Sequence, residues 1–345
     1  MKKRHVSIIA AAILAALIMF CRFNTQAADF YSLKVYPVIS AVLSFISSAV
    51  PFSLNDIAIA ILITAALVIA ASAVKRRISW KQFIVKELTL ALWTFVWFYA
   101  GWCTNYSRSD IFTRTGSHRI AYDELVFKEF LEGFTDEING AYVAVDGIDR
   151  QEIERQIKSY YSEVPEKYGL CTPRKWQHTK PMLARRLQSA VGVTGYMGPL
   201  GCEFHVNDDV LPESYPFTFA HEYAHLMGVS NEAEANWWGF QACRASEIRE
   251  IRYSAYFSIL TYVWNNAYRL LDEEEFLAWR STVNPEIIND MIKESEYWTE
   301  MRIPALDKVQ TFIYDLFLKA NNIGSGIKNY SEVVQMLISL DSPER

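Results

Sequence analysis

A run of eighteen residues without a charge, Ile57–Val74 (IAIAILITAALVIAASAV), is the strongest constraint on how this chain folds. About twenty apolar residues in a helix span the hydrocarbon core of a bilayer. A helix that is apolar all round is rare at the surface of a soluble domain. Lys75, Arg76 and Arg77 follow directly, as basic residues do at the cytoplasmic end of a membrane helix. The run therefore predicts a transmembrane helix near residues 57–74.

Two further apolar runs flank this helix. Residues 6–22 follow a basic start, and residues 88–103 end in aromatic side chains that suit a membrane interface. The first run could instead be a cleaved signal peptide, because Thr25–Asp29 (TQAAD) offers a small-residue cleavage site. Residues 30–51 are apolar but contain Pro37 and several serines. We expect an interfacial helix or hairpin there, and a further crossing is the less favoured alternative.

Charge is divided unevenly along the chain. Residues 1–103 carry ten Lys/Arg and three Asp/Glu, a net charge of +7, and the other 242 residues carry 24 and 36, a net charge of −12. Three crossings with the amino terminus inside place eight of the ten basic residues on the cytoplasmic side. We therefore predict a multi-pass anchor in the cytoplasmic membrane over residues 1–104, and an extracytoplasmic domain over residues 105–345. Its acidity argues against nucleic acid as a partner.

Residues 105–345 have the pattern of a mainly α domain with a small β-sheet. Apolar residues recur at helical spacing in residues 122–134 and 149–161, and residues 237–271 form a long, aromatic, helical stretch. The glycine-punctuated segment Thr194–Asn207 (TGYMGPLGCEFHVN) alternates in part and predicts one or two strands. The five cysteines form no Cys-x-x-Cys pair, which disfavours a thiolate zinc site.

Residues 221–225 read His-Glu-Tyr-Ala-His, the HExxH pattern. Residues four apart share one face of a helix, so His221 and His225 are able to bind one zinc ion. Zinc lowers the pKa of a bound water towards 7, and Glu222 is placed to take its proton and later to protonate the leaving amine. The pattern therefore predicts a zinc-dependent hydrolase of peptide bonds. Coincidental core histidines are less favoured, because burying them beside a glutamate is costly without a metal.

A catalytic zinc ion needs a third protein ligand and an open position. Gly228 is a natural place for the helix to end, and Asn231, Glu232 and Glu234 follow it. Glu232 is favoured as the ligand, because Asn236 lies four residues on and could support it from the same face. Glu234 is the alternative, although Asn-x-x-Glu is also typical of a helix cap. The spacing alone leaves both glutamates open.

Four residues outside the motif are weaker candidates. Tyr253 and Tyr256 could each offer a phenol to a tetrahedral oxyanion, although a place in the aromatic core is the stronger expectation. Glu203, in an expected strand, could contact substrate, although a structural or surface position is favoured. A fourth metal ligand at His205 is disfavoured.

The segment HEYAH…NEAEAN is similar to the gluzincins, zinc peptidases whose third ligand is the glutamate of an E-x-x-x-D motif on the following helix. Glu232 matches that glutamate, and Asn236 stands in place of the usual aspartate. The interval between His225 and Glu232 is shorter than in the better-studied members. Over most of its length the chain resembles a bacterial family classed as a domain of unknown function, membrane-anchored proteins with an extracytoplasmic HExxH domain. The matching pieces are PFSLND, SAVGVTGYMGPLGCEFHVN, PFTFAHEYAHLMGVSNEAEANWWGF, YSAYF and LFLKANNIGSGIKNYSEVV.

The resemblance implies a zincin-like metallopeptidase domain behind three transmembrane helices, with Zn²⁺ as cofactor. Its implied partners are the lipid bilayer and a peptide or protein substrate of the cell envelope. The alternative is a catalytically silent envelope protein that uses a zinc fold for binding or scaffolding, and the intact Glu222 argues against it. Proteolysis inside the membrane is disfavoured, because polar segments at residues 205–216 and 230–236 flank the HExxH helix.

Overall fold

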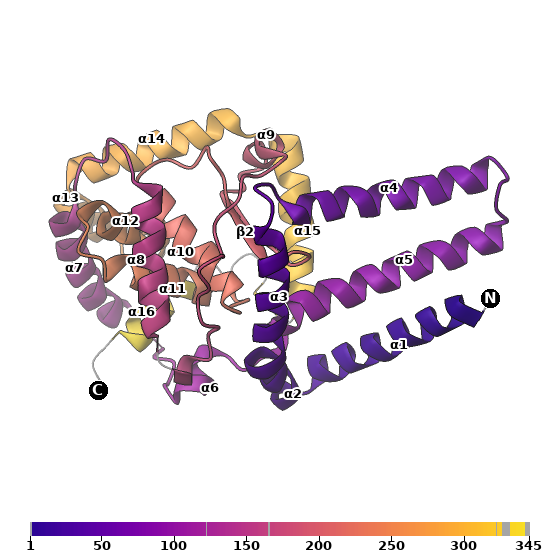
Figure 1. Ribbon diagram of the computed structural model, residues 1–345. Helices are drawn as coiled ribbons and strands as arrows, with labels where there is room; N and C mark the ends of the chain where they lie inside the picture. Colours follow the sequence, from indigo (N-terminus) through magenta and orange to yellow (C-terminus); the bar gives the residue numbers. More distant parts are fainter. Residues whose placement is uncertain (1, 122, 165, 322, 326–331, 342–345) are drawn as a thin grey trace. The chain divides into compact units, whose positions relative to one another are not determined.

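The computed structural model describes residues 2–121, 123–164, 166–321, 323–325 and 332–341. Helices make up most of the chain, and the described residues contain a two-stranded sheet of β1 (Gly195–Gly198) and β2 (Glu203–Val206) (Figure 1). The prediction of a mainly α chain with a small sheet is confirmed. The chain divides into two compact units. The first unit is Met1–Ser109, Arg174–Leu183 and Met197–Phe204, and the second is Asp110–Pro173, Ala184–Tyr196 and His205–Arg345.

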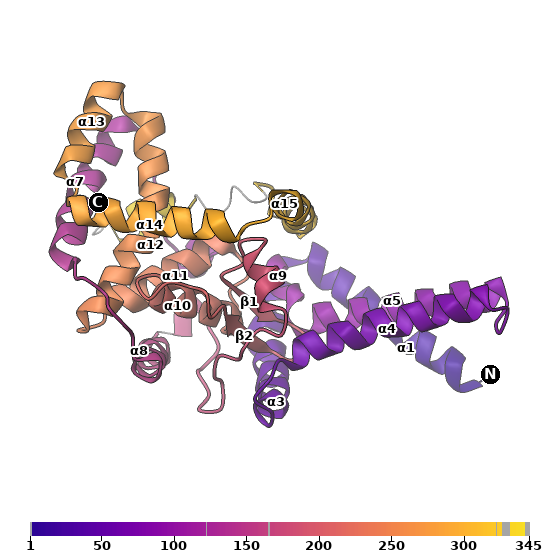
Figure 2. The ribbon, with the colours of Figure 1, turned by 90° about the horizontal axis from the view of Figure 1, so that it is seen from above.

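Among the described residues of the first unit, four stretches are long and apolar enough to cross a membrane, namely Val6–Phe23, Thr25–Ser48, Leu54–Val74 and Trp80–Gly101. Three of them correspond to the apolar runs predicted from the sequence, and they lie in α1 (Lys2–Phe23), α4 (Leu54–Val74) and α5 (Trp80–Gly101). Helix α5 ends two residues before the run predicted at residues 88–103 does. These three helices run in a similar direction in Figure 1, Figure 2 shows α1 crossing the other two at an angle, and α5 contacts both α1 and α4.

The fourth stretch is a single helical path around a proline. It consists of α2 (Thr25–Phe30), a π-helical turn at Tyr31–Val35, and α3 (Tyr36–Ser48), which has Pro37 in its first turn. Proline lacks an amide hydrogen and crowds the carbonyl group four residues earlier. A wider π turn just before the ring relieves that crowding, so the chain stays helical instead of forming a hairpin.

Helix α3 runs across the direction of α1, α4 and α5 within the first unit (Figures 1 and 2). Its buried side chains are mostly polar and its exposed ones are mostly apolar. The buried residues include Ser40, Ser44 and Ser47, and Val42 and Phe45 are more than half exposed. A soluble helix has the opposite arrangement. The exposed face of α3 therefore suits lipid better than water.

A buried ion pair joins distant segments of the first unit. Lys180 Nζ lies 2.8 Å from Glu203 Oε2, and the two side chains are 9% and 2% exposed. Glu203 also accepts hydrogen bonds from the hydroxyl groups of Ser47 and Ser53 and from the backbone N–H of Asn55. Buried charges are tolerated where their hydrogen bonds are made, as they are here. These contacts fit the structural role that was favoured for Glu203.

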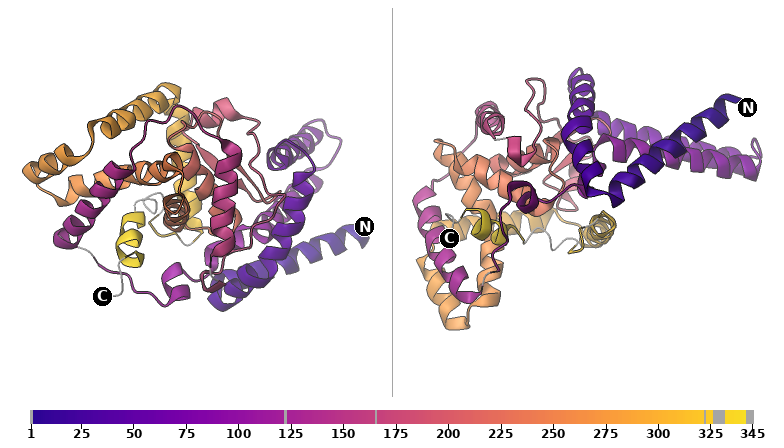
Figure 3. Two further views of the ribbon diagram at one scale, coloured as in Figure 1. Left: turned by 60° about the vertical axis from the view of Figure 1, so that its left-hand side comes forward. Right: turned by 90° about the horizontal axis from the view of Figure 1, so that it is seen from below.

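The second unit is built around α10 (Tyr215–Leu226), in which all twelve residues are buried. Helix α10 packs against α11 (Glu232–Arg244) and α12 (Arg249–Leu270), and α12 packs against α7 (Glu124–Ala141). The remaining helices surround this core in Figures 1 to 3. They are α6 (Ile111–Thr115), α8 (Arg150–Glu163), α9 (Arg185–Ser189), α13 (Glu273–Thr282), α14 (Pro285–Met301), α15 (Pro304–Ala320) and α16 (Val333–Leu340), with short 3-10 turns at Cys103–Ser107 in the first unit and Glu166–Tyr168 in the second.

Most local expectations for the second unit are met. Helices α7 and α8 cover the segments predicted at residues 122–134 and 149–161, although Tyr122 itself lies outside the described residues. The stretch expected to be helical over residues 237–271 is two helices, because the chain turns at Ala245–Ile248. All five cysteines are described, and none is joined to another by a disulfide.

We predict that Glu203→Gln destabilises the protein strongly. The change leaves the Lys180 ammonium group buried without its counter-charge, and breaking such a pair costs about 3–5 kcal/mol. Thermal unfolding of the full chain in detergent measures the effect as a lower Tm. Glu152→Gln, which removes an exposed partner of Arg155, is the control and should change the Tm little. Equal Tm values for Glu203→Gln and wild type would contradict the structural role.

Candidate metal centre

A tight turn after α10 brings two polar segments together. The helix ends at Leu226, and Gly228 then adopts φ = +99°, a conformation that strains any residue with a side chain. The backbone N–H groups of Met227 and Val229 donate to the carbonyl oxygens of Tyr223 and Ala224, which closes the helix end. Helix α11 starts only a few residues later and packs on α10. The predicted helix stop at Gly228 is therefore confirmed.

Asn231 fixes where α11 begins. Its side-chain Oδ1 accepts a hydrogen bond from the backbone N–H of Glu234 at 2.9 Å, as an N-cap does. Glu232 is consequently the first residue of α11, at the amino-terminal end of that helix and next to the turn. Asn231 thus caps the helix as Asn-x-x-Glu indicates, whereas the Glu234 side chain bonds to Arg114 and Trp238.

Three of the residues proposed as metal ligands converge. The Nε2 atoms of His221 and His225 are 3.1 Å apart, and Glu232 Oε2 lies 3.3 Å and 3.4 Å from them. All three side chains are at most 10% exposed. Among the described His, Cys, Asp and Glu residues, this is the group whose ligand atoms lie close enough together to hold one metal ion.

These distances suit a tetrahedral ion. In a tetrahedral zinc site, the metal lies about 2.0–2.1 Å from each nitrogen or oxygen ligand, so neighbouring ligand atoms lie about 3.3 Å apart. The tautomer of His225 is suitable as well, because its Nδ1 lies 2.7 Å from the Val229 carbonyl oxygen. A hydrogen on Nδ1 leaves a lone pair on Nε2. A proton or a metal ion between the three atoms allows them to lie this close, and their spacing is that of the ligands of a divalent metal.

The electrostatics of the cluster also favour a positive charge at its centre. Burial lowers the pKa of His225, but the neighbouring Glu232 carboxylate outweighs burial and raises that pKa to about 9. Burial likewise raises the pKa of Glu232, but His225 and His221 outweigh it and hold that pKa well below its ordinary value. Glu232 therefore stays ionised, and it draws either a proton or a metal ion to the histidines.

Glu222 lies beside the cluster without being part of it. Burial raises its pKa, and the two histidines oppose that rise. Its Oε2 makes no hydrogen bond to any described residue. A Cβ atom at Gly195 would lie 2.6 Å from Glu222 Oε1, so β1 passes close to the carboxylate and a larger residue there would displace the Glu222 side chain. A buried carboxylate with a raised pKa is a suitable proton acceptor.

Two contacts to the cluster were missed from the sequence. The Tyr314 hydroxyl on α15 donates a hydrogen bond of 2.7 Å to Glu232 Oε1, the carboxylate oxygen that does not face the histidines. The Val229 carbonyl group orients His225. Tyr314 is 82 residues from Glu232, and no motif or periodicity connects the two.

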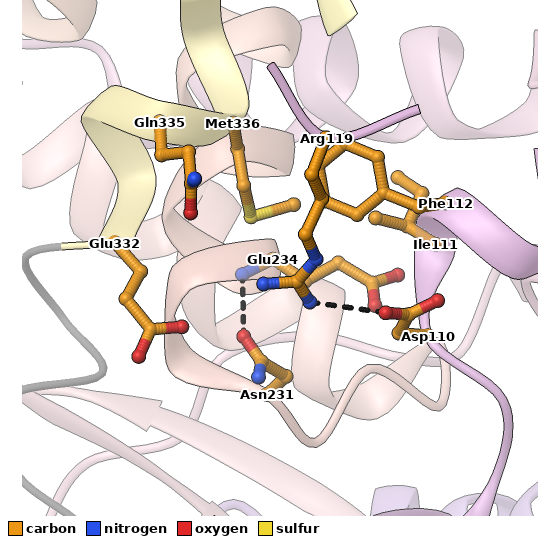
Figure 4. A pocket seen from close by; sticks show the side chains of 9 residues that line it. All are labelled: Asp110, Ile111, Phe112, Arg119, Asn231, Glu234, Glu332, Gln335 and Met336. Carbon is orange, nitrogen blue, oxygen red and sulfur yellow. Dashed lines mark hydrogen bonds and ion pairs between the residues drawn. The ribbon is translucent and has the colours of Figure 1, made fainter. Parts of the chain in front are cut away.

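Glu234 is engaged elsewhere. Its carboxylate forms an ion pair with Arg114, with both side chains 7% exposed, and it accepts a hydrogen bond from Trp238 Nε1. Figure 4 shows Glu234 in a small pocket with Asn231, Asp110 and Arg119. The structure thus brings Glu232, and not Glu234, to the two histidines.

The remaining candidates do not join the cluster. The hydroxyl of Tyr253 bonds to Asp290 and that of Tyr256 bonds to Glu137, each at 3.2 Å. Both tyrosines pack among aromatic rings of the core, as the stronger expectation had it. His205 is buried against the ring of Tyr196, with centroids 4.4 Å apart, and it is not one of the converging ligands. The Asn236 Nδ2 atom makes no hydrogen bond to any described residue. We assign neither Tyr253 nor Tyr256 a part in hydrolysis.

Comparison with known proteins gives a family. The family described as a protein of unknown function (DUF3810) matches residues 31–338, which include both strands, the HExxH segment and α15. The chain belongs to this family. No curated protein and no solved structure matches the chain. Membership of DUF3810 agrees with the resemblance to a family of unknown function, and the activity has to be inferred from the site itself.

We predict that Glu232→Gln and Glu234→Gln differ sharply in zinc binding. Glu232→Gln removes a ligand charge, and the loss should exceed the roughly 10–100-fold drop in affinity that follows mutation of an outer-shell partner. Glu234→Gln, the matched control two residues away, should keep affinity near wild type. Zinc content of the purified full chain and competition with a chelator measure both. Loss of zinc from Glu234→Gln alone would contradict the assignment.

Zinc affinity should also rise with pH. A proton on His225 competes with the metal for Nε2, and the pKa of about 9 means that the proton is present at neutral pH. Displacing one proton makes the apparent affinity increase about tenfold per pH unit up to about pH 9 and then level off. Chelator competition at about pH 6.5, 7.5 and 8.5 tests this. Constant affinity over that range would exclude proton displacement from His225.

Proposed function

We propose that this protein is a membrane-anchored, zinc-dependent metallopeptidase that hydrolyses peptide bonds outside the cytoplasmic membrane. The observation that carries the proposal is the convergence of His221, His225 and Glu232, with the Glu222 carboxylate beside them. Two histidines and one carboxylate are the protein ligands of many catalytic zinc sites, which keep one position open for water or substrate.

Each residue has a separate task in this proposal. His221, His225 and Glu232 would hold the zinc ion, which supplies a Lewis acid and an acidified water at neutral pH. Glu222 accepts a proton, and its raised pKa brings it closer to the operating pH, where a general base is most effective. The same carboxyl group then donates that proton to the leaving amine. The Tyr314 hydroxyl donates to Glu232 Oε1, which leaves Glu232 Oε2 facing the histidines.

The membrane placement rests on the apolar helices and the basic residues. Helices α1, α4 and α5 are the three that run in a similar direction, and α3 lies across them (Figure 1). In the proposed topology these three helices cross the bilayer and α3 lies at the interface. With basic residues kept in the cytoplasm, an odd number of crossings puts the second unit outside. A signal-peptide cleavage after the first run would leave the same placement.

A second function is favoured by one observation, the burial of the site. His221, Glu222, His225 and Glu232 are each at most 8% exposed, so a peptide needs a path to them. A catalytically silent zinc-binding scaffold of the cell envelope needs no such path. The two proposals share the metal site and differ in what Glu222 does.

We predict that Glu222→Gln abolishes proteolysis without loss of zinc. Removing a general base and acid lowers the rate by roughly 10²–10⁴-fold. Cells that carry wild type or Glu222→Gln are compared for new amino termini among envelope proteins, and Glu273→Gln, an exposed glutamate on α13, is the control.

The outcomes separate the two functions. Termini that appear with wild type and Glu273→Gln but not with Glu222→Gln support a peptidase. Full zinc content with identical termini in all three strains favours the scaffold. Absence of zinc from purified wild type at neutral pH would remove both.

A further inference from the structure

Helix α15 has an apolar stripe on its outer side. Leu306, Val309, Ile313 and Leu316 follow one another at intervals of three or four residues, which places them in one line along the helix. Phe312 borders this line, and the five side chains are between 41% and 63% exposed. We call these five residues the α15 stripe.

The inner side of α15 holds the helix to its own unit. Tyr314 donates to Glu232, and Leu318 is buried. The backbone N–H of Ile303, just before the helix, donates to the Ala190 carbonyl oxygen. At about 100° per residue, Tyr314 and Leu318 lie roughly opposite the stripe. Figure 2 shows α15 at the margin of the second unit, apart from α10, α11 and α12.

The stripe is therefore not the side by which α15 packs on the second unit. Exposed apolar side chains in a continuous line typically mark a surface that binds something apolar. Lys308 and Lys319 are exposed and lie along one border of the stripe, and Lys319 Nζ forms an ion pair of 2.6 Å with Asp315 on the same helix. Lysines in that position extend their ammonium groups to lipid phosphates while their stems cover the apolar edge. This is the residue pattern of a helix that lies in a membrane interface.

A bilayer is the occupant that the rest of the chain favours. The first unit contains four stretches long and apolar enough to cross a membrane. The chain passes between the two units at several points, from Ser109–Asp110 to Phe204–His205. These covalent links keep the second unit within reach of the membrane that holds the first. A lipid surface is thus always available to α15, whereas a protein partner or a second copy has to be recruited.

We propose that the α15 stripe binds the surface of the lipid bilayer in which the chain is anchored. Leu306, Val309, Phe312, Ile313 and Leu316 enter the boundary between headgroups and acyl chains, and Lys308 contacts lipid phosphate. This contact is independent of hydrolysis, and it holds whether the metal centre cleaves peptides or serves as a scaffold.

Site-specific photocrosslinking of the full chain in phospholipid vesicles tests the proposal. A benzophenone amino acid is introduced at Phe312 or, as the control, at Leu125 on α7, which is 77% exposed. Both positions are already apolar and exposed, so neither change disturbs the core. After illumination, mass spectrometry of the peptides identifies what each position has reacted with. A second pair of samples carries Ile313→Asp in addition, which places a charge in the stripe.

Phospholipid adducts several-fold more abundant at Phe312 than at Leu125, and reduced by Ile313→Asp, are the expected result. Equal yields of lipid adduct at the two positions would overturn the proposal. Crosslinked dimers as the main product at Phe312 would instead assign the stripe to a second copy of the chain, and adducts to another protein would assign it to a protein partner. Unfolding by Ile313→Asp is detected from its Tm, and the comparison of Phe312 with Leu125 does not depend on that variant.

Discussion

Three electron-pair donors that face one another at 3.1–3.4 Å repel unless a positive charge lies between them. Holding them there requires contacts from several directions. Helix α10 puts His221 and His225 on one face, the Gly228 turn reverses the chain, and Asn231 starts α11 so that Glu232 comes first. The fold thus imposes on these side chains an arrangement that they would not adopt by themselves.

The first unit holds its buried charges in a different way. Lys180 and Glu203 are paired with each other, and Glu203 is also hydrogen-bonded to serine and backbone donors. In the metal centre, His221 Nδ1 and Glu222 Oε2 have no hydrogen-bond partner among the described residues. Native proteins leave few buried polar atoms unsatisfied, and the exceptions tend to occur at functional sites. The contrast separates a structural set of charges from a set that is suited to binding and chemistry.

Local sequence patterns were enough to predict much of the fold and of the candidate metal site. Helical periodicity predicted α7 and α8, glycine punctuation predicted β1 and β2, and HExxH with Gly228 predicted two histidines followed by a turn. The choice between Glu232 and Glu234 stayed open, because both lie in the first turn of the same helix. Arg114, 120 residues before Glu234, is what engages the second glutamate. Tyr314 was missed for a similar reason, since contacts across such intervals depend on how helices pack and leave no local pattern.

The fourth apolar helix shows a different limit. Pro37 and the serines of residues 30–51 indicate an interruption when they are considered singly. The chain instead forms a π turn ahead of the proline, and the serines face the protein while apolar side chains face outward. A sequence pattern records which residues are apolar, but it does not record the widened turn that keeps the helix continuous.

In the hydrogen bond between His225 Nδ1 and the Val229 carbonyl oxygen, the acceptor is a backbone atom. Any amino acid at position 229 supplies the same oxygen, so the valine side chain takes no part in orienting the imidazole by this bond. What evolution has to preserve at this point is the path of the backbone, and that path is set one residue earlier, by a glycine whose φ few other residues can adopt.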